Sequence, residues 1–184
     1  MSTQKEIILS GVGGQGMILC GTLIAEAAVV YDQKLATLSS EYGTETRGTF
    51  AKSDIIISEE PIYFPDVTNP NLVVCLHQIA YERYSSKIPS DALILFDSDQ
   101  ITPHPENSAN EQGVPISRMA KELGNPATAN ILTMGIILGL LHLVSPEGAK
   151  GVIRKFFASK GEKIIDLNLY AFDTGYAFGE QLRK

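Results

Sequence analysis

Residues 7–16 read IILSGVGGQG, a short apolar run that leads directly into a glycine-rich segment. Met17, Cys20, Ile24 and Ala27 then recur at helical spacing. A strand that ends in a glycine loop at the start of a helix is the usual opening of an α/β domain. This stretch therefore predicts the fold class.

The remainder of the chain extends the same pattern. Continuous apolar runs at 72–76 and 92–96 are typical of strands buried on both faces of a parallel sheet. Further strands are expected at 35–38 and over 49–58, which ends in three isoleucines and a turn. The pattern predicts a three-layer α/β/α sandwich with a mostly parallel, Rossmann-like sheet. Helices are expected at 79–84, 119–123, 127–143, 146–159 and 169–182.

Composition narrows the protein class. The chain has 184 residues, which fits one domain over 1–184. Fifteen Lys and Arg against 21 Asp and Glu give a net charge of −6, so we expect neither nucleic acid nor an anionic membrane as a partner. Two separated cysteines and no visible export signal indicate a cytoplasmic protein. The uncharged stretch 124–146 is interpreted as a buried helix and not a membrane span.

The glycine loop Gly11-Val12-Gly13-Gly14-Gln15-Gly16 matches G-x-G-x-x-G. Free backbone N–H groups at a helix start favour an anionic ligand, although a tight turn with glycines for packing gives the same pattern. Met17 stands where a P-loop would place lysine, which excludes a P-loop. A dinucleotide site also needs an acid near the tip of the second strand, and Glu41 is the candidate there.

A second polar motif spans Glu41-Tyr42-Gly43-Thr44-Glu45-Thr46-Arg47-Gly48-Thr49. The Arg47 guanidinium offers a planar set of donors for a carboxylate or phosphate, and the two glycines allow tight bending around a partner. The alternative is a solvated turn with internal Glu–Arg pairs. Composition alone does not separate these two interpretations.

In this order, the motifs GxGGQG and YGxExRG resemble the gamma subunit of the 2-oxoacid:ferredoxin oxidoreductases. The resemblance continues through 55–57, 60–62, Gln78 and Asn130, and it spans nearly the whole chain. One position departs from the family pattern, because Thr49 stands where a second glycine commonly follows Arg-Gly.

The resemblance implies that this chain is one subunit of a larger enzyme and is inactive without the other subunits. The complete enzyme would decarboxylate a 2-oxoacid, with 2-oxoglutarate as the nearest branch, using thiamine diphosphate, Mg and iron–sulfur clusters on alpha, beta and delta subunits. Coenzyme A would be the co-substrate, and ferredoxin would receive the electrons. We expect no catalytic residue, no metal ligand and no tightly held cofactor in this chain. The resemblance implies a ligand or partner loop at Gly11, Gly13, Gly14, Gln15 and Gly16, an interface or substrate-side loop at Tyr42, Gly43, Glu45, Arg47 and Gly48, and a further candidate at Asn130.

Two other functions stay open on the residues alone. One is a stand-alone dinucleotide-binding oxidoreductase, and the other is a regulatory ligand-binding α/β domain. A structural role is expected for His77, a surface loop position for His104 between Pro103 and Pro105, and a hydrogen-bonded place in the core for His142. Gly135 and Gly139 are expected to let their helix lie close to the sheet.

Overall fold

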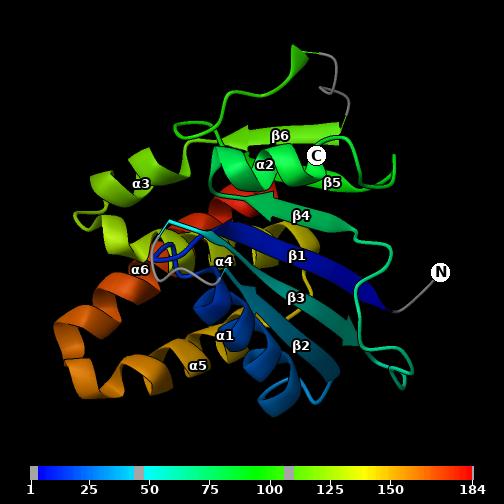
Figure 1. The fold of residues 1–184 in the computed structure, drawn as a ribbon. Helices are drawn as coiled ribbons and strands as arrows, with labels where there is room; N and C mark the ends of the chain where they lie inside the picture. The colour runs from blue at the N-terminus through cyan, green and yellow to red at the C-terminus, as the bar shows by residue number, and fades with distance from the viewer. Residues whose placement is uncertain (1–3, 44–47, 106–109, 184) are drawn as a thin grey trace.

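In the computed structural model, which describes residues 4–43, 48–105 and 110–183, one sheet organises the chain (Figure 1). Its strand order is β2-β3-β1-β4-β5-β6, and within these strands only β3 runs against the others. The predicted mostly parallel sheet is confirmed. The strands are β1 (Lys5–Val12), β2 (Leu35–Tyr42), β3 (Phe50–Ser58), β4 (Leu72–Cys75), β5 (Leu93–Asp97) and β6 (Glu111–Val114).

Helices cover the two faces of this sheet unequally, which confirms the predicted α/β/α layers (Figure 1). The short helix α2 (Gln78–Tyr84) covers one face. The other face carries α1 (Met17–Val30), α3 (Ile116–Glu122), α4 (Ala129–Leu141), α5 (Pro146–Phe157) and α6 (Glu162–Leu182), with 3-10 turns at Pro126–Thr128 and Ala158–Lys160.

Alternating side chains of each central strand build two separate cores. Leu72 and Val74 of β4 belong to the large core under α1 and α4, whereas Val73 and Cys75 face α2. All four are fully buried. Successive residues of a strand point to opposite faces, so a strand covered on both sides needs a continuous apolar run.

Helices α4 and α6 pack with their backbones in direct approach. A Cβ atom added at Gly139 would lie 2.2 Å from the Tyr176 carbonyl oxygen, and one at Gly179 would lie 2.2 Å from the Ile136 oxygen. A Cβ atom at Gly135 would likewise lie 2.3 Å from the Phe172 carbonyl oxygen. The expectation that these glycines bring α4 close to the sheet is therefore wrong. They serve helix-to-helix contact, which the i, i+4 spacing alone cannot distinguish from helix-to-sheet contact.

Three further features differ from the sequence expectations. Strand β6 has the sequence EQGV, with no apolar run, and forms only because β5 offers it a parallel backbone partner. Helix α6 begins at Glu162, not near 169. His142 is not a core residue, because it ends α4 in a left-handed conformation and its partly exposed ring lies 2.9 Å from Arg183 Nη1.

The central part of the uncharged stretch forms a buried helix, as expected. Ten consecutive residues of α4, from Asn130 to Gly139, are buried against other helices. No described helix combines the length and the apolar content needed to cross a bilayer.

The α4–α6 contact predicts the effect of adding one methyl group. Alanine exceeds glycine in intrinsic helix stability by about 1 kcal/mol, so Gly179→Ala would be stabilising on propensity alone. Overpacking against a backbone oxygen costs more, typically about 1–3 kcal/mol, because the two helices must separate. We expect Gly179→Ala to lower the free energy of unfolding measured in urea.

Ala177 is the matched control because it is exposed on the same helix. Ala177→Leu adds more carbon atoms and should change the unfolding free energy by less than about 0.5 kcal/mol. A Gly179→Ala variant more stable than the wild type would contradict the close-packing account.

Candidate functional site

The glycine loop lies where two neighbouring strands, β1 and β4, connect to helices on opposite faces of the sheet. From the end of β1 the chain passes to α1 on one face, and from the end of β4 it passes to α2 on the other. Strands β1 and β4 are parallel neighbours. In open α/β sheets, this arrangement creates a crevice at the carboxyl ends of the two strands, where ligands bind.

Gln15 braces the loop across this crevice. Its Oε1 accepts a hydrogen bond from the Val12 N–H at 2.8 Å, and its Nε2 donates to the Leu76 carbonyl oxygen at 2.8 Å. A Cβ atom at Gly11 would lie 2.3 Å from the same Oε1, which explains the glycine there. The Gln15 amide thus ties β1 to β4.

The loop leaves several backbone donors at the start of α1. The Gly13 N–H bonds to the Thr49 oxygen at 2.9 Å, and the Gln15 N–H bonds to Val12 at 3.2 Å. Within the described residues, the N–H groups of Gly14, Gly16 and Met17 have no hydrogen-bond partner. No side chain caps α1, and its first turn holds no acid. The positive end of the helix dipole is therefore available to an anion.

The second motif is brought against the glycine loop by strand pairing. Val12 lies opposite Phe50 in the β1–β3 ladder, and Tyr42 lies opposite Ala51 in the β2–β3 ladder. The Gly43 N–H bonds to the Phe50 oxygen at 3.0 Å. Gly48 has a φ of 76°, which glycine adopts without strain. Glu45 and Arg47 lie outside the described residues.

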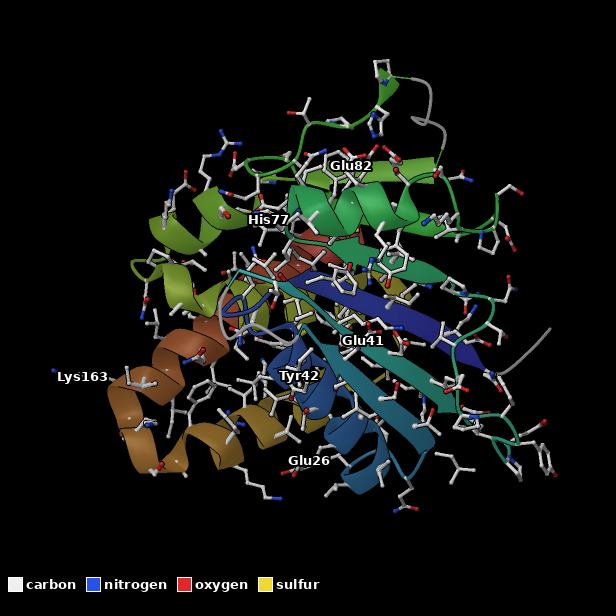
Figure 2. All side chains as sticks on the ribbon, in the orientation of Figure 1. Glu26, Glu41, Tyr42, His77, Glu82 and Lys163 are labelled. Carbon is white, nitrogen blue, oxygen red and sulfur yellow. The ribbon has the colours of Figure 1, made fainter. Side chains whose placement is uncertain are left out.

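A cavity of about 350 Å³ separates the two motifs. Tyr42 forms one wall from the end of β2, and its side chain is 69% exposed (Figure 2). A second cavity of about 200 Å³ lies on the other side of the loop and includes Leu76 and Asp97. The first cavity is lined by Val12, Gly13, Gly14, Gly16, Met17, Ile18, Tyr42 and Ala51.

Glu41 is turned away from this cavity. It lies opposite Lys52 in the ladder, and its carboxylate is 3.7 Å from the Lys52 ammonium. Adjacent residues of a strand face opposite sides, so Glu41 lies on the α2 side while Tyr42 faces the cavity. Strand β3 also separates β2 from β1. The acid that a dinucleotide ribose requires is not supplied by Glu41.

Asn130 supports the loop from behind. A Cβ atom at Gly16 would lie 2.6 Å from its Nδ2, while its Oδ1 accepts from the Ile131 N–H at 2.9 Å. Asn130 is buried, at 8% exposure. Its contact with Gly16 therefore fixes the start of α1 and requires glycine there, where φ is 74°.

The sequence reasoning missed one buried carboxylate in the crevice. Asp97 is 2% exposed at the end of β5, where its Oδ2 accepts hydrogen bonds from the Ser117 N–H and hydroxyl, and its Oδ1 accepts from Asp99 N–H. Asp97 directly follows the apolar run 92–96, at the carboxyl end of an expected strand, and this position could have identified it from the sequence. Asp97 anchors the start of α3 beside the second cavity.

The histidines have local structural contacts. His77 Nδ1 accepts from the Ile79 N–H at 3.2 Å and caps α2. His104 Nε2 lies 2.9 Å from Glu82 Oε2, and its ring packs on Tyr81. The contact of His77 agrees with its expected structural role, and His104 lies in a loop with its side chain 38% exposed, as expected.

Neither cysteine is suited to metal binding. Burial raises the pKa of the Cys75 thiol to about 12 and raises that of Cys20 further. Metal ligation needs the thiolate, which both environments disfavour. Among the described residues, no group of three or more His, Cys, Asp or Glu is placed to hold a metal ion.

Comparison with known proteins places this geometry in a family. Residues 6–178 match the family model of pyruvate ferredoxin/flavodoxin oxidoreductases. The 2-oxoglutarate synthase subunit KorC of Methanocaldococcus jannaschii is 39% identical, over 97% of this chain and 96% of its own. KorC of Archaeoglobus fulgidus is 30% identical, over 100% of this chain and 92% of its own.

Solved structures agree with the sequence relatives. The gamma subunit of a keto/oxoacid ferredoxin oxidoreductase from Geobacter sulfurreducens superposes with a TM-score of 0.83 at 34% identity, covering 98% of this chain and 99% of its own. A 2-oxoglutarate:ferredoxin oxidoreductase chain from Magnetococcus marinus gives 0.90 at 25% identity, but this chain spans only 32% of it. The chain belongs to the pyruvate ferredoxin/flavodoxin oxidoreductase family and matches its gamma subunit along almost the whole length.

Proposed function

We propose that this chain is the gamma subunit of a 2-oxoglutarate:ferredoxin oxidoreductase. The complete enzyme would convert the 2-oxoacid to acyl-CoA, with thiamine-dependent decarboxylation and reduction of ferredoxin. The choice of 2-oxoglutarate is supported by the two KorC subunits at 39% and 30% identity. Ketoisovalerate oxidoreductase subunit VorA of Methanothermobacter thermautotrophicus is also 30% identical, although the match covers only 36% of VorA.

One observation carries the role proposed for the glycine loop. Both motifs border the 350 Å³ cavity, and unpaired N–H groups at the start of α1 lie in the same loop. Such a helix start stabilises phosphate or carboxylate. The related Magnetococcus marinus structure holds 2-oxoglutarate, coenzyme A and succinyl-CoA. We assign the loop to an anionic group of the coenzyme A substrate in the assembled enzyme.

The described residues do not fit the resident cofactors of such an enzyme. Cys20 and Cys75 are buried in different elements, and burial keeps both thiols protonated. An iron–sulfur cluster requires several thiolates, and thiamine diphosphate requires a bound divalent cation. We therefore place thiamine diphosphate, Mg and the clusters on alpha, beta and delta partner subunits. This chain would contribute a substrate-facing wall and an interface.

The first prediction from the proposed function distinguishes it from that of a stand-alone dinucleotide enzyme. Because Glu41 faces away from the glycine loop and pairs with Lys52, the ribose of NAD lacks its usual acidic partner. Calorimetric titration of the isolated chain with NAD and NADP should show no micromolar binding. Micromolar affinity for either nucleotide would support the dehydrogenase alternative.

The second prediction concerns the backbone of the loop. Gly14 and Gly161 both have positive φ, 99° and 88°, and a Cβ at either would meet nothing within 4 Å. Alanine should therefore be strained at both positions, at a cost of about 1–3 kcal/mol each. Only Gly14 lies in the loop, where its N–H is unpaired. In the reconstituted enzyme, Gly14→Ala should raise the KM for coenzyme A about 10-fold.

Gly161→Ala is the matched control, because Gly161 precedes α6 and does not border either cavity of the loop. It should lower thermal stability like Gly14→Ala and leave the KM for coenzyme A unchanged. Equal KM values in the two variants would show that the loop does not serve the substrate.

The third prediction concerns Arg47, whose role rests on the sequence motif. Arg47→Ala should leave the isolated chain folded, because a loop charge contributes about 0–1 kcal/mol to stability. If the guanidinium pairs with a carboxylate or phosphate in the assembled enzyme, its loss costs about 2–5 kcal/mol. We expect weaker assembly or slower 2-oxoacid-dependent ferredoxin reduction when the variant is titrated against the other subunits.

Arg154→Ala provides the control, because Arg154 is exposed on α5. It should behave as wild type in both readouts. Wild-type assembly and turnover of Arg47→Ala would show that Arg47 is only a solvated loop residue.

A further inference from the structure

The end of the sheet opposite the glycine loop presents two exposed aromatic side chains. Between β3 and β4 the chain forms a connection, residues 59–71, that extends beyond the arrowhead of β3 in Figure 1. Tyr63 is 91% exposed and Phe64 is 58% exposed. Exposed aromatic pairs are uncommon on monomers and are typical anchors of protein interfaces.

The base of this connection is fixed by hydrogen bonds. Glu6 Oε2 accepts from the N–H groups of Thr68 and Asn69 at 2.7 and 2.8 Å. The Glu6 backbone exchanges two further hydrogen bonds with Asn71, at 2.8 and 3.0 Å. A loop held in this way has already lost much of its conformational entropy, which lowers the cost of binding.

The part of the loop that carries the aromatic pair is restricted as well. Pro61 and Pro65 flank it and fix their own φ angles. The Thr37 hydroxyl on β2 donates to the Pro65 carbonyl oxygen at 3.3 Å, and the Glu60 N–H donates to Ser58 Oγ at 3.0 Å. The two rings are therefore presented from a defined backbone and not from a free tail.

The charges around the pair indicate what binds it. Glu59, Glu60 and Asp66 are exposed and flank the two rings in the sequence. Among the described residues, Glu59 alone of the three has a cation nearby, Lys34 at 3.9 Å. The chain as a whole carries −6. A second copy would bring like charges together, and an anionic lipid surface would be repelled, whereas a surface rimmed by Lys and Arg would be attracted.

We propose that Tyr63 and Phe64 insert into a basic-rimmed apolar pocket on another subunit of the oxidoreductase. This inference rests on the proposed function, because it requires assembly with other subunits. It assigns to this chain a docking surface at the end of the sheet away from the glycine loop.

The test is a titration of the full chain against the remaining subunits. Its two readouts are the affinity of association and the rate of ferredoxin reduction. Tyr63→Ser should leave folding unchanged, since the side chain is 91% exposed, and should weaken association about 10-fold or more. Glu60→Lys should weaken association mainly at low salt, because exposed charges are screened as ionic strength rises. At saturating subunit concentrations, turnover should return to the wild-type value.

Tyr170→Ser is the matched control, because Tyr170 is 62% exposed on α6, outside the 59–71 connection. It should assemble as wild type. If Tyr63→Ser also assembles as wild type, the docking inference fails while the proposed function stands. If the wild-type chain binds no subunit, both fail. Loss of a wild-type dimer, or of binding to phosphatidylglycerol vesicles, in Tyr63→Ser would likewise overturn the subunit assignment.

Discussion

Strand β3 hydrogen-bonds along its whole length to β1 on one side and to β2 on the other, running against both. This register places Val12 opposite Phe50 and Tyr42 opposite Ala51, so the ends of β1 and β2 and the start of β3 meet at one edge. The Gly13-to-Thr49 hydrogen bond joins the two loops there. Without β3 in this position, the glycine loop would have no second wall, and Tyr42 would not border its cavity.

The position of β3 between β1 and β2 also changes how the glycine motif must be interpreted. In a dinucleotide-binding unit the second strand lies beside the first, and its terminal acid reaches the ribose. Here β3 occupies that place, and strand alternation turns Glu41 towards Lys52 on the opposite face. Gln15 uses both ends of its amide to fix the loop to β4. The motif therefore leaves unpaired N–H groups at a helix start, without the acidic partner that makes such a loop selective for a dinucleotide.

Packing of the helices accounts for the unequal layers of the fold. The glycines of α4 and α6 let two backbones approach, so α6 covers α4 and buries it almost completely. On the opposite face, α2 with its seven residues is the one helix among the described residues. Combined with buried, protonated thiols, this architecture gives a rigid scaffold that presents loops at both ends of a sheet.

The sequence by itself determined the layers and the strand-to-helix turn that carries the candidate site. Continuous apolar runs at 72–76 and 92–96 are buried completely only in a sheet covered on both faces. The glycines at 11–16 suit a tight strand-to-helix turn. Both are local requirements, one of burial and the other of backbone angle. Tertiary structure alone decided which elements meet. The short polar strand β6, the partner of Gly135 and Gly139, the brace formed by Gln15, and the direction of Glu41 all depend on residues distant in the chain. Periodicity along one segment carries no information about which distant backbone lies opposite it.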